Sequence, residues 1–302
     1  MKKRFSIALA GMMMAVLAGC SSAAEETLPA AEETKMEAGT QTAAEEAVPE
    51  TVIIRSYNGE KEQIELEVPY DPQRIAILDM ASLDIIDALG LGDRVVGSAP
   101  TTIDYLSDYV PDDSNGIANL GTIKNADLVE VAACEPDVIF IGGRLSAVYE
   151  DLSAIAPVVY LSVEPEKGVV KSTAENARTI ASIFGEEEKA DALMKEFDSR
   201  IQAVREQYEG KNAIVGMYSG SNYNVLGNDG RCSLIGNELG FHNLGADAGE
   251  ITSTHGNEAS WETIVNLNPE YMFVLDRNSA ISSTEGNPAV QEAIENELIK
   301  EL

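Results

Sequence analysis

The sequence predicts a two-lobe α/β protein in which two mainly parallel sheets are joined by one long helix. Short apolar runs without polar alternation recur along the chain, which is typical of strands buried on both faces. Helical stretches separate these runs, as in parallel α/β folds. A single long amphipathic helix divides the chain into two similar halves. The runs lie at residues 75–78, 138–141 and 158–161 in the first half, and at residues 213–218 and 271–275 in the second.

The two halves share a motif at residues 129–144 and 261–277. Each copy reads as a short helix, a proline with an acidic residue, an apolar strand and an arginine, with the same proline-to-arginine spacing. Ligands of open parallel sheets bind beyond the carboxyl ends of the strands. We therefore expect Arg144 and Arg277 to face a ligand in a cleft between the lobes. The alternative is that repeated αβ units look alike and that both arginines are solvated.

The first half opens with a predicted hairpin, because residues 51–56 and 63–68 flank Asn58-Gly59, a strong turn signal. Alternating strands and helices follow. The expected elements are a strand at 75–78, a helix at 82–89 capped by Ser82 and stopped by Gly90, a strand at 94–97, an irregular stretch at 100–119, a helix at 146–154 and a strand at 158–161.

Two helices are expected next, at residues 169–184 and 186–208. The second keeps an apolar period of 3.6 residues, and about 23 residues give roughly 35 Å of helix, suited to a strut between lobes. Two ordinary helices of one domain are the alternative. The pattern then restarts with strands at 213–218 and 223–226, a helix at 233–239, a loop at 249–256, the second motif copy and a helix at 289–302. No strand follows this last helix, so we expect the sequence to lack the C-terminal strand and helix of its fold.

The N-terminus reads as a signal peptide, with three basic residues followed by an apolar stretch too short to span a membrane. It ends in Leu-Ala-Gly before Cys20 and resembles a bacterial lipoprotein signal. That resemblance implies acylation of Cys20, palmitate included, and stable anchoring to the bilayer outside the cytoplasm. An ordinary secretory signal is the alternative. The expected divisions are a signal peptide at 1–20, a disordered acidic tether at 21–51, an N-terminal lobe at 52–185, a linker helix at 186–209 and an incomplete C-terminal lobe at 210–302.

The formal net charge is −30, which argues against nucleic acid and anionic membrane surfaces as partners. No nucleophile elbow, P-loop or zincin motif is present, so we expect a binding protein rather than an enzyme. The polar residues left in strand-end or loop positions are Arg144, Arg231, Arg277 and His255. Converging guanidinium forks suit a multiply charged, oxygen-rich ligand, and a loop imidazole can complete a metal's coordination shell. A solvated surface histidine is the alternative for His255.

At these residues the chain resembles the lipoprotein substrate-binding components of ATP-driven importers for ferric siderophores, above all those that bind catecholate siderophores. The similarity covers residues 52–302 and includes Gly-Gly before Arg144, Gly before Arg231, Thr-His255-Gly, and Asp-Arg277-Asn. It implies a cleft between two α/β lobes joined by one helix. It further implies that the three arginines contact catecholate oxygens and that His255 ligates the iron. Ferric iron would arrive within the ligand, and no intrinsic cofactor is expected.

The resemblance also implies docking on an ABC permease through one acidic residue per lobe. Glu262 matches that position in the second lobe. In the first lobe the position holds Val129, with Glu130 one residue further, so Glu130 is the weaker candidate. The family pairs its histidine with a tyrosine near the C-terminus, and that segment would lie beyond Leu302. We expect a monomer. Haem, cobalamin and ferric hydroxamate stay open as ligands, and a siderophore esterase or an inactive fragment as other classes of protein.

Overall fold

The computed structural model describes four parts of the chain, namely residues 49–112, 114–247, 255–280 and 290. The expected signal peptide, Cys20, most of the tether and nearly all of the helix expected at 289–302 lie outside these residues. Within the described part, no helix is both long enough and apolar enough to cross a membrane.

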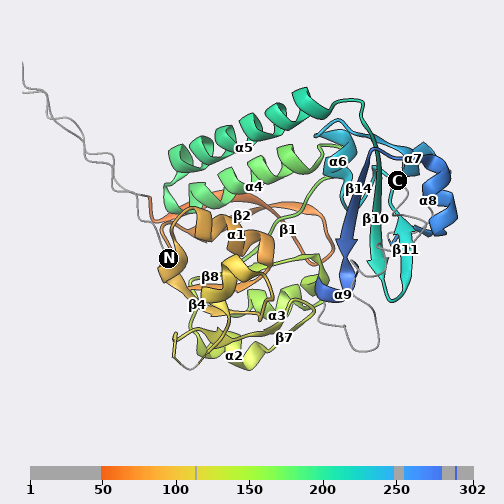
Figure 1. Cartoon of the computed structure of the whole chain (residues 1–302). Coiled ribbons are helices and arrows are strands. Elements are labelled where there is room, and N and C mark those ends of the chain that lie inside the picture. The colour runs from red at the N-terminus through yellow and green to blue at the C-terminus, as the bar shows by residue number, and fades with distance from the viewer. Residues whose placement is uncertain (1–48, 113, 248–254, 281–289, 291–302) are drawn as a thin grey trace, which may run out of the picture. The chain divides into compact units, whose positions relative to one another are not determined.

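The first lobe is built on a five-stranded parallel sheet of order β5-β4-β3-β8-β9 (Figure 1). Its central strands β3 and β8 are buried at every residue. Alternate residues pack into two separate apolar clusters, because Ile77 and Phe140 enter one and Leu78 and Ile141 the other. The sheet is therefore covered on both faces, as its unalternated runs predict. The strands are β3 (Ile75–Leu78), β4 (Val95–Ser98), β5 (Ala118–Asn119), β8 (Val138–Ile141) and β9 (Val158–Tyr160).

The predicted hairpin is confirmed as the antiparallel pair β1 (Thr51–Tyr57) and β2 (Gln63–Pro69). Helix α1 (Met80–Ala88) begins earlier than predicted, because Asp79 rather than Ser82 is its cap and accepts from the Ser82 amide at 3.0 Å. The helix predicted at 146–154 is a 3-10 turn followed by a short α-helix. The remaining elements of this lobe are η1 (Gly92–Arg94), η2 (Asp104–Tyr109), β6 (Gly121–Thr122), β7 (Asn125–Ala126), α2 (Leu128–Ala133), η3 (Gly143–Val148) and α3 (Tyr149–Ser153).

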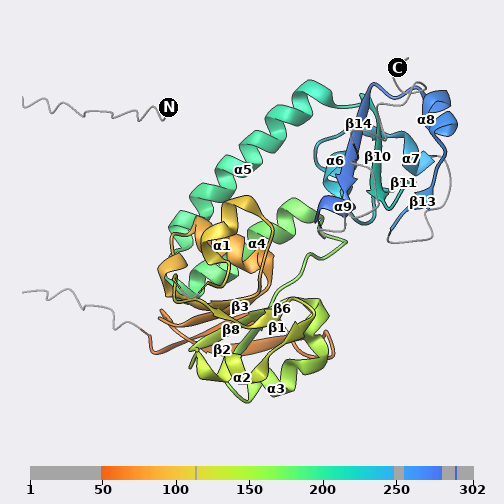
Figure 2. The ribbon, with the colours of Figure 1, turned by 60° about the horizontal axis from the view of Figure 1, so that its bottom comes forward.

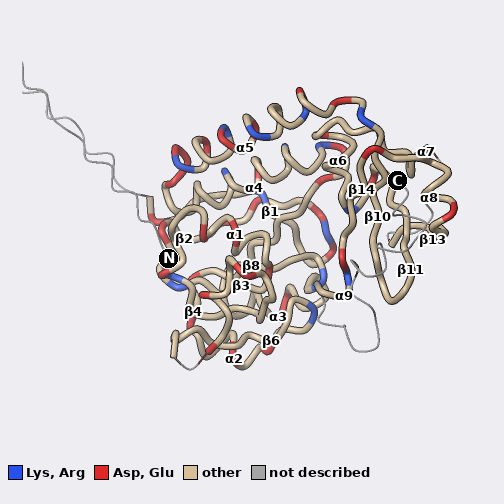
Figure 3. Tube along the Cα trace, viewed as in Figure 1, with Lys and Arg blue, Asp and Glu red and all other residues tan. Residues whose placement is uncertain are grey.

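Helices α4 (Val169–Phe184) and α5 (Glu187–Tyr208) confirm the predicted helical pair. The apolar face of α4 packs into the core of the first lobe through Ile180, Ile183 and Phe184. Helix α5 contacts different partners at its two ends (Figure 2). Lys189 near its start donates to the carbonyl of Leu89 in the first lobe, whereas Tyr208 at its end stacks on Phe241 with ring centroids 5.4 Å apart. Basic and acidic residues are interspersed along α5 (Figure 3).

The second lobe contains a mixed sheet in which β10 pairs in parallel with β14 and β12, and antiparallel with β11. Its strands are β10 (Asn212–Ser219), β11 (Asn222–Val225), β12 (His242–Asn243), β13 (Asn257–Glu258) and β14 (Tyr271–Asp276). Both faces are apolar, because Ile214 packs with Ile264 on one side and Val215 packs with Leu226 on the other. The helices are α6 (Ser233–Asn237), α7 (Leu244–Asp247), α8 (Trp261–Leu267) and α9 (Arg277–Ala280).

Candidate functional site

The structure brings Arg231 and His255 together in the second lobe. Arg231 lies in the turn between β11 and α6, and His255 lies two residues before β13. Antiparallel pairing of Val225 with Asn257 sets β13 beside β11. The Nη1 atom of Arg231 consequently lies 3.3 Å from Nδ1 of His255. Two residues that are 24 positions apart in the sequence thus form one polar pair, with both side chains exposed.

The Arg231 contact favours one tautomer of the His255 imidazole. A guanidinium only donates hydrogen bonds, so Nδ1 of His255 must accept, and the ring proton must lie on Nε2. A doubly protonated imidazole would have no lone pair for the contact and would repel the arginine. In that tautomer the one ring lone pair of His255 faces Arg231.

Arg277 occupies a different position, at the carboxyl end of β14, where it begins α9. Its Nη1 donates to Oγ of Ser219 at 3.1 Å, and its side chain is half-buried. Parallel pairing of β14 with β10 places it beside the turn that ends β10. Arg277 is therefore held at the strand end where a ligand of a parallel sheet is expected.

The residues on either side of Arg277 fix its backbone. Asn278 is only 5% exposed and makes two hydrogen bonds with the backbone of Gly220, accepting from N–H at 2.8 Å and donating to the carbonyl at 2.9 Å. Asp276 accepts from the hydroxyl of Ser279 at 2.6 Å, and this bond holds the pKa of Asp276 below its ordinary value. In the sequence, the triplet Asp276-Arg277-Asn278 stood out only through a resemblance, and its role in holding the backbone was not predicted.

Arg144 lies in the first lobe, in η3, and is exposed. It makes no hydrogen bond or ion pair with any residue in the described part of the chain. A Cβ at either of the two glycines before it would crowd a side chain from the same sheet edge. A Cβ on Gly142 would lie 2.8 Å from Oδ1 of Asp79, and one on Gly143 would lie 2.6 Å from the hydroxyl of Tyr160.

The carboxyl edge of the first sheet is therefore polar as well as basic. Asp79 follows β3, Arg144 follows β8, and Tyr160 ends β9. Burial raises the pKa of the Tyr160 hydroxyl, and the neighbouring Tyr57 and Asp79 raise it further. Asp79 and Tyr160 were missed by the sequence analysis, although the paired glycines were a visible signal for a close approach.

The two docking candidates both lie in the first turn of a short helix. Glu130 is in α2, whose cap Asp127 accepts from the Glu130 amide at 3.2 Å. Glu262 is in α8, which is capped by Ser260. Both glutamates are exposed. Neither forms an ion pair with a residue that the structure describes. Val129, beside Glu130, is 75% exposed, so an apolar side chain accompanies the carboxylate on that surface.

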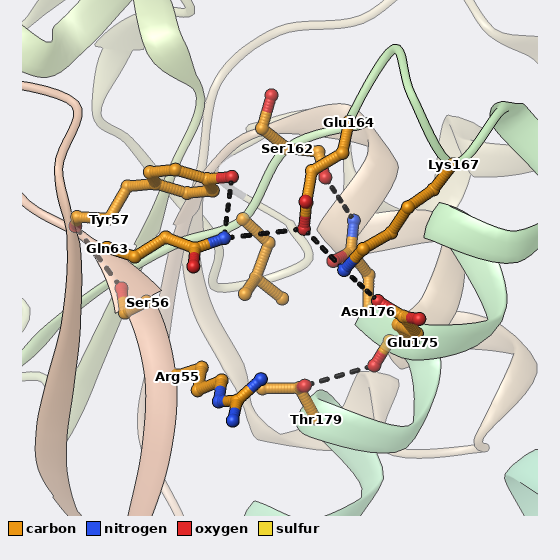
Figure 4. Close-up of a pocket in the computed structure, with 11 residues that line it drawn as sticks. Arg55, Ser56, Tyr57, Gln63, Ser162, Glu164, Lys167, Glu175, Asn176 and Thr179 are labelled. Carbon is orange, nitrogen blue, oxygen red and sulfur yellow. Dashed lines mark hydrogen bonds and ion pairs between the residues drawn. The ribbon is translucent and has the colours of Figure 1, made fainter.

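A separate pocket lies in the first lobe, between the β1–β2 hairpin and α4 (Figure 4). Lys167 at its wall bridges Glu164 at 2.8 Å and Glu175 at 2.5 Å. Hydrogen bonds to these two carboxylates raise the pKa of Lys167 to about 12. None of the predicted site residues lines this pocket. Its lysine and its two glutamates pair with one another, so we do not assign the ligand site to it.

Metal-ligating side chains are not clustered in the described part of the chain, where no group of three or more His, Cys, Asp or Glu could hold an ion. Cys134 and Cys232 are both free. Burial raises the pKa of each thiol, which disfavours the thiolate that a metal or an electrophile would need.

Comparison with known proteins identifies relatives over most of the chain. The petrobactin-binding protein YclQ of Bacillus subtilis is 34% identical over 239 residues, which are 78% of this chain and 73% of that protein. The ferric-anguibactin-binding protein FatB of Vibrio anguillarum is 24% identical over 76% of this chain and 71% of its own length.

Solved structures share the fold. The crystal structure of YclQ superimposes with a TM-score of 0.73 at 32% identity, covering 83% of this chain and 85% of that one. The catecholate-siderophore binding protein VctP of Vibrio cholerae gives a TM-score of 0.70 at 26% identity, over 82% of this chain and 86% of its own. These likenesses confirm the predicted α/β architecture with two lobes. A family model described as periplasmic binding protein matches residues 75–299, which confirms the expectation of a binding protein rather than an enzyme. The chain belongs to the periplasmic binding protein family.

Proposed function

We propose that this protein captures a ferric catecholate siderophore outside the cytoplasm and delivers it to an ABC permease. The names of its relatives supply the ligand class, since YclQ is a petrobactin-binding protein and VctP a catecholate-siderophore binding protein. The observation that carries the proposal is the Arg231–His255 pair. It sets a fork of N–H donors, suited to anionic oxygens, beside an imidazole suited to iron.

Arg231 and His255 cannot keep their contact while His255 ligates iron. A neutral imidazole has one lone pair, and Arg231 uses it in the ligand-free protein. Iron must take that lone pair, directly or after the ring proton moves to the other nitrogen. The Arg231–His255 contact breaks in the same step, and N–H donors of Arg231 turn to the catecholate oxygens. Ligand binding thus replaces the Arg231–His255 contact with two others, one between Arg231 and the catecholate oxygens and one between His255 and the iron.

Arg277 and Arg144 complete the proposed site from the carboxyl ends of the two sheets. Arg277 is pre-oriented by Ser219, whereas Arg144 is exposed. A charge-assisted hydrogen bond contributes about 1.5–3 kcal/mol. Three such groups favour a multiply negative ferric catecholate over the neutral or less charged alternatives, which are ferric hydroxamate, haem and cobalamin. The iron belongs to the ligand, and no resident cofactor is needed.

The rest of the proposal concerns the setting of the domain. Acylated Cys20 would anchor the chain to the bacterial membrane, and residues 21–51 would act as the tether. The lobes would comprise residues 52–185 and 210–302, with residues 186–209 as the linker, in a monomeric protein. Relatives named as lipoproteins support the anchor. A Cys20→Ser variant should release the protein from the membrane fraction, and full retention would contradict the anchor.

Fluorescence quenching of Trp261 tests the ligand. Trp261 is the single tryptophan, begins α8 and packs against Tyr223 with ring centroids 5.5 Å apart. Ferric catecholate should quench it with saturation, and Arg231→Ala or Arg277→Ala should weaken binding more than about tenfold. Arg200→Ala is the matched control, because Arg200 pairs with Glu196 on exposed α5. Saturable binding of hydroxamate, haem or cobalamin with none of catecholate would refute the assignment.

Docking is tested separately from capture. Glu262→Ala should leave ligand affinity unchanged and reduce siderophore uptake by cells, with Glu130→Ala giving the smaller reduction. Glu150→Ala, an exposed first-turn glutamate of α3, serves as the control. Wild-type uptake by the Glu262 variant would remove that residue from the permease interface.

A further inference from the structure

The carboxylate of Glu238 ties the second lobe to the first. Glu238 follows α6 as its C-terminal cap residue. Its Oε1 accepts hydrogen bonds from the backbone N–H groups of Val169 at 2.7 Å and Val170 at 3.4 Å. These amides open α4, whose own cap Gly168 supplies no side chain. A helix of the first lobe thus receives its amino-terminal acceptor from the second lobe.

The local backbone is adapted to this contact. Gly168 has φ +78°, and a Cβ there would lie 2.7 Å from Oε1 of Glu238. Any larger residue would be strained and would also push the carboxylate away. Within the part of the chain that the structure describes, the second oxygen of Glu238 is buried without a hydrogen-bond partner. Burying an unpaired carboxylate oxygen costs free energy. The hydrogen bonds between Glu238 and α4 form although the surroundings disfavour the charge.

Residues 237 and 238 are also held from the linker helix. Nη1 of Arg205, in α5, donates to the carbonyl of Asn237 at 3.2 Å and to that of Glu238 at 3.3 Å. The end of α6 is therefore held by both α4 and α5. Helix α4 is in turn packed into the first lobe's core, so these polar contacts help to hold α6 relative to that core.

The other end of α6 carries the candidate ligand residue. Arg231 precedes Cys232, the N-terminal cap of α6, which adopts a left-handed conformation at φ +61°. Five helical residues span about 8 Å. A displacement of α6 at Glu238 is therefore transmitted to Arg231 through one short, rigid element.

We propose that Glu238 is a positioning residue that fixes α6, and with it Arg231, relative to the first lobe. The link to ligand affinity rests on the proposed function, whereas the tie between α6 and α4 does not. Loss of the carboxylate frees the amides of Val169 and Val170 and lets the second lobe shift against α4. Arg231 then meets the ligand in a range of orientations rather than in one.

The tie is tested first without ligand, by amide hydrogen exchange on the full chain. Glu238→Ala should speed exchange at Val169 at least about tenfold. Glu238→Gln keeps an oxygen acceptor in place, so its exchange rate at Val169 should be closer to that of the wild type. Gly168→Ala disturbs the same contact from the α4 side and should behave like Glu238→Ala. Glu196→Ala, which removes an exposed pair on α5, should change nothing. Unchanged exchange at Val169 in the alanine variants would overturn the proposal.

Affinity for ferric catecholate then tests the link to Arg231. Glu238→Ala should weaken binding about fivefold or more, with less effect for Glu238→Gln. A lower unfolding midpoint with unchanged affinity of the folded protein would reduce Glu238 to a stabilising contact and refute its positioning role. If wild type binds no siderophore, the proposed function fails, while the exchange result still decides whether the tie exists.

Discussion

Substitution of Asn278 by alanine should release the segment that carries Arg277. Asn278 is 5% exposed, and its amide group bonds both backbone polar groups of Gly220, in the turn between β10 and β11. These two bonds join the start of α9 to a turn 58 residues earlier. Asn278→Ala removes both bonds and introduces no new charge or bulk.

The magnitude follows from two neutral hydrogen bonds. Each contributes about 0.5–1.5 kcal/mol net, so their loss should lower the free energy of unfolding by about 1–3 kcal/mol. Gly220 is half-buried, and water can therefore reach its freed N–H and C=O groups in part. We expect a value in the lower half of that range, about 1–2 kcal/mol.

Urea unfolding monitored by Trp261 emission measures this change, because Trp261 lies in the same lobe. Asn266→Ala is the matched control, since Asn266 is exposed on α8 and alanine favours the helix. Catecholate affinity should fall in the Asn278 variant, since Arg277 loses its fixed backbone. A free energy of unfolding within about 0.3 kcal/mol of wild type would refute the claim that Asn278 holds this segment.

Two further predictions concern the neighbours of the candidate arginines. Gly143→Ala should reduce ligand affinity, because the new Cβ would lie 2.6 Å from the Tyr160 hydroxyl and displace η3 with Arg144. Adding Tyr160→Phe to this variant removes the hydroxyl and should restore the affinity. Failure of this rescue would contradict the steric cause. Asp276 has a folded-state pKa below its ordinary 3.8, so it stabilises the fold above about pH 4, and this contribution is lost as the pH falls through the lowered value. The stability difference between wild type and Asp276→Asn, measured by urea unfolding, should therefore be present at pH 7 and vanish under strongly acidic conditions; a difference that grows on acidification would contradict this sign.

The strands were the most predictable part of the fold. Runs such as residues 75–78 and 138–141 are apolar without alternation, and the structure confirms both ranges as β3 and β8. Burial on both faces of a parallel sheet explains such a run, and its length of four residues favours a strand over a buried helix. Helix starts were less predictable. At α1 two polar residues stood within reach of the first turn, and Asp79 prevailed over Ser82 because its carboxylate lies where the Ser82 amide and hydroxyl both donate.

The positions of the candidate site residues at strand ends and in loops were predictable, whereas their contacts were not. Arg231, His255 and Arg277 follow strands or lie in loops, which the sequence shows. The pairing of Arg231 with His255 depends on β13 lying antiparallel to β11, and a two-residue strand leaves no periodic signal in the sequence. The tie at Glu238 was equally hidden, because its partners are backbone amides 69 and 68 positions away. Nearly every residue has the same backbone N–H and C=O groups, so the sequence does not show which of them a side chain will bind.

The symmetry between Arg144 and Arg277 does not extend to their energetics. Arg277 is half-buried and already bonded to Ser219, so a ligand meets a donor with few conformations left to lose. Arg144 is exposed, and immobilising such a side chain costs about 0.5–1.5 kcal/mol. Equal contacts to a ligand would therefore give Arg277 the larger net share of the affinity. Arg277 thus supplies a preorganised contact of the proposed site, and Arg144 adds a contact that forms only when the ligand is present.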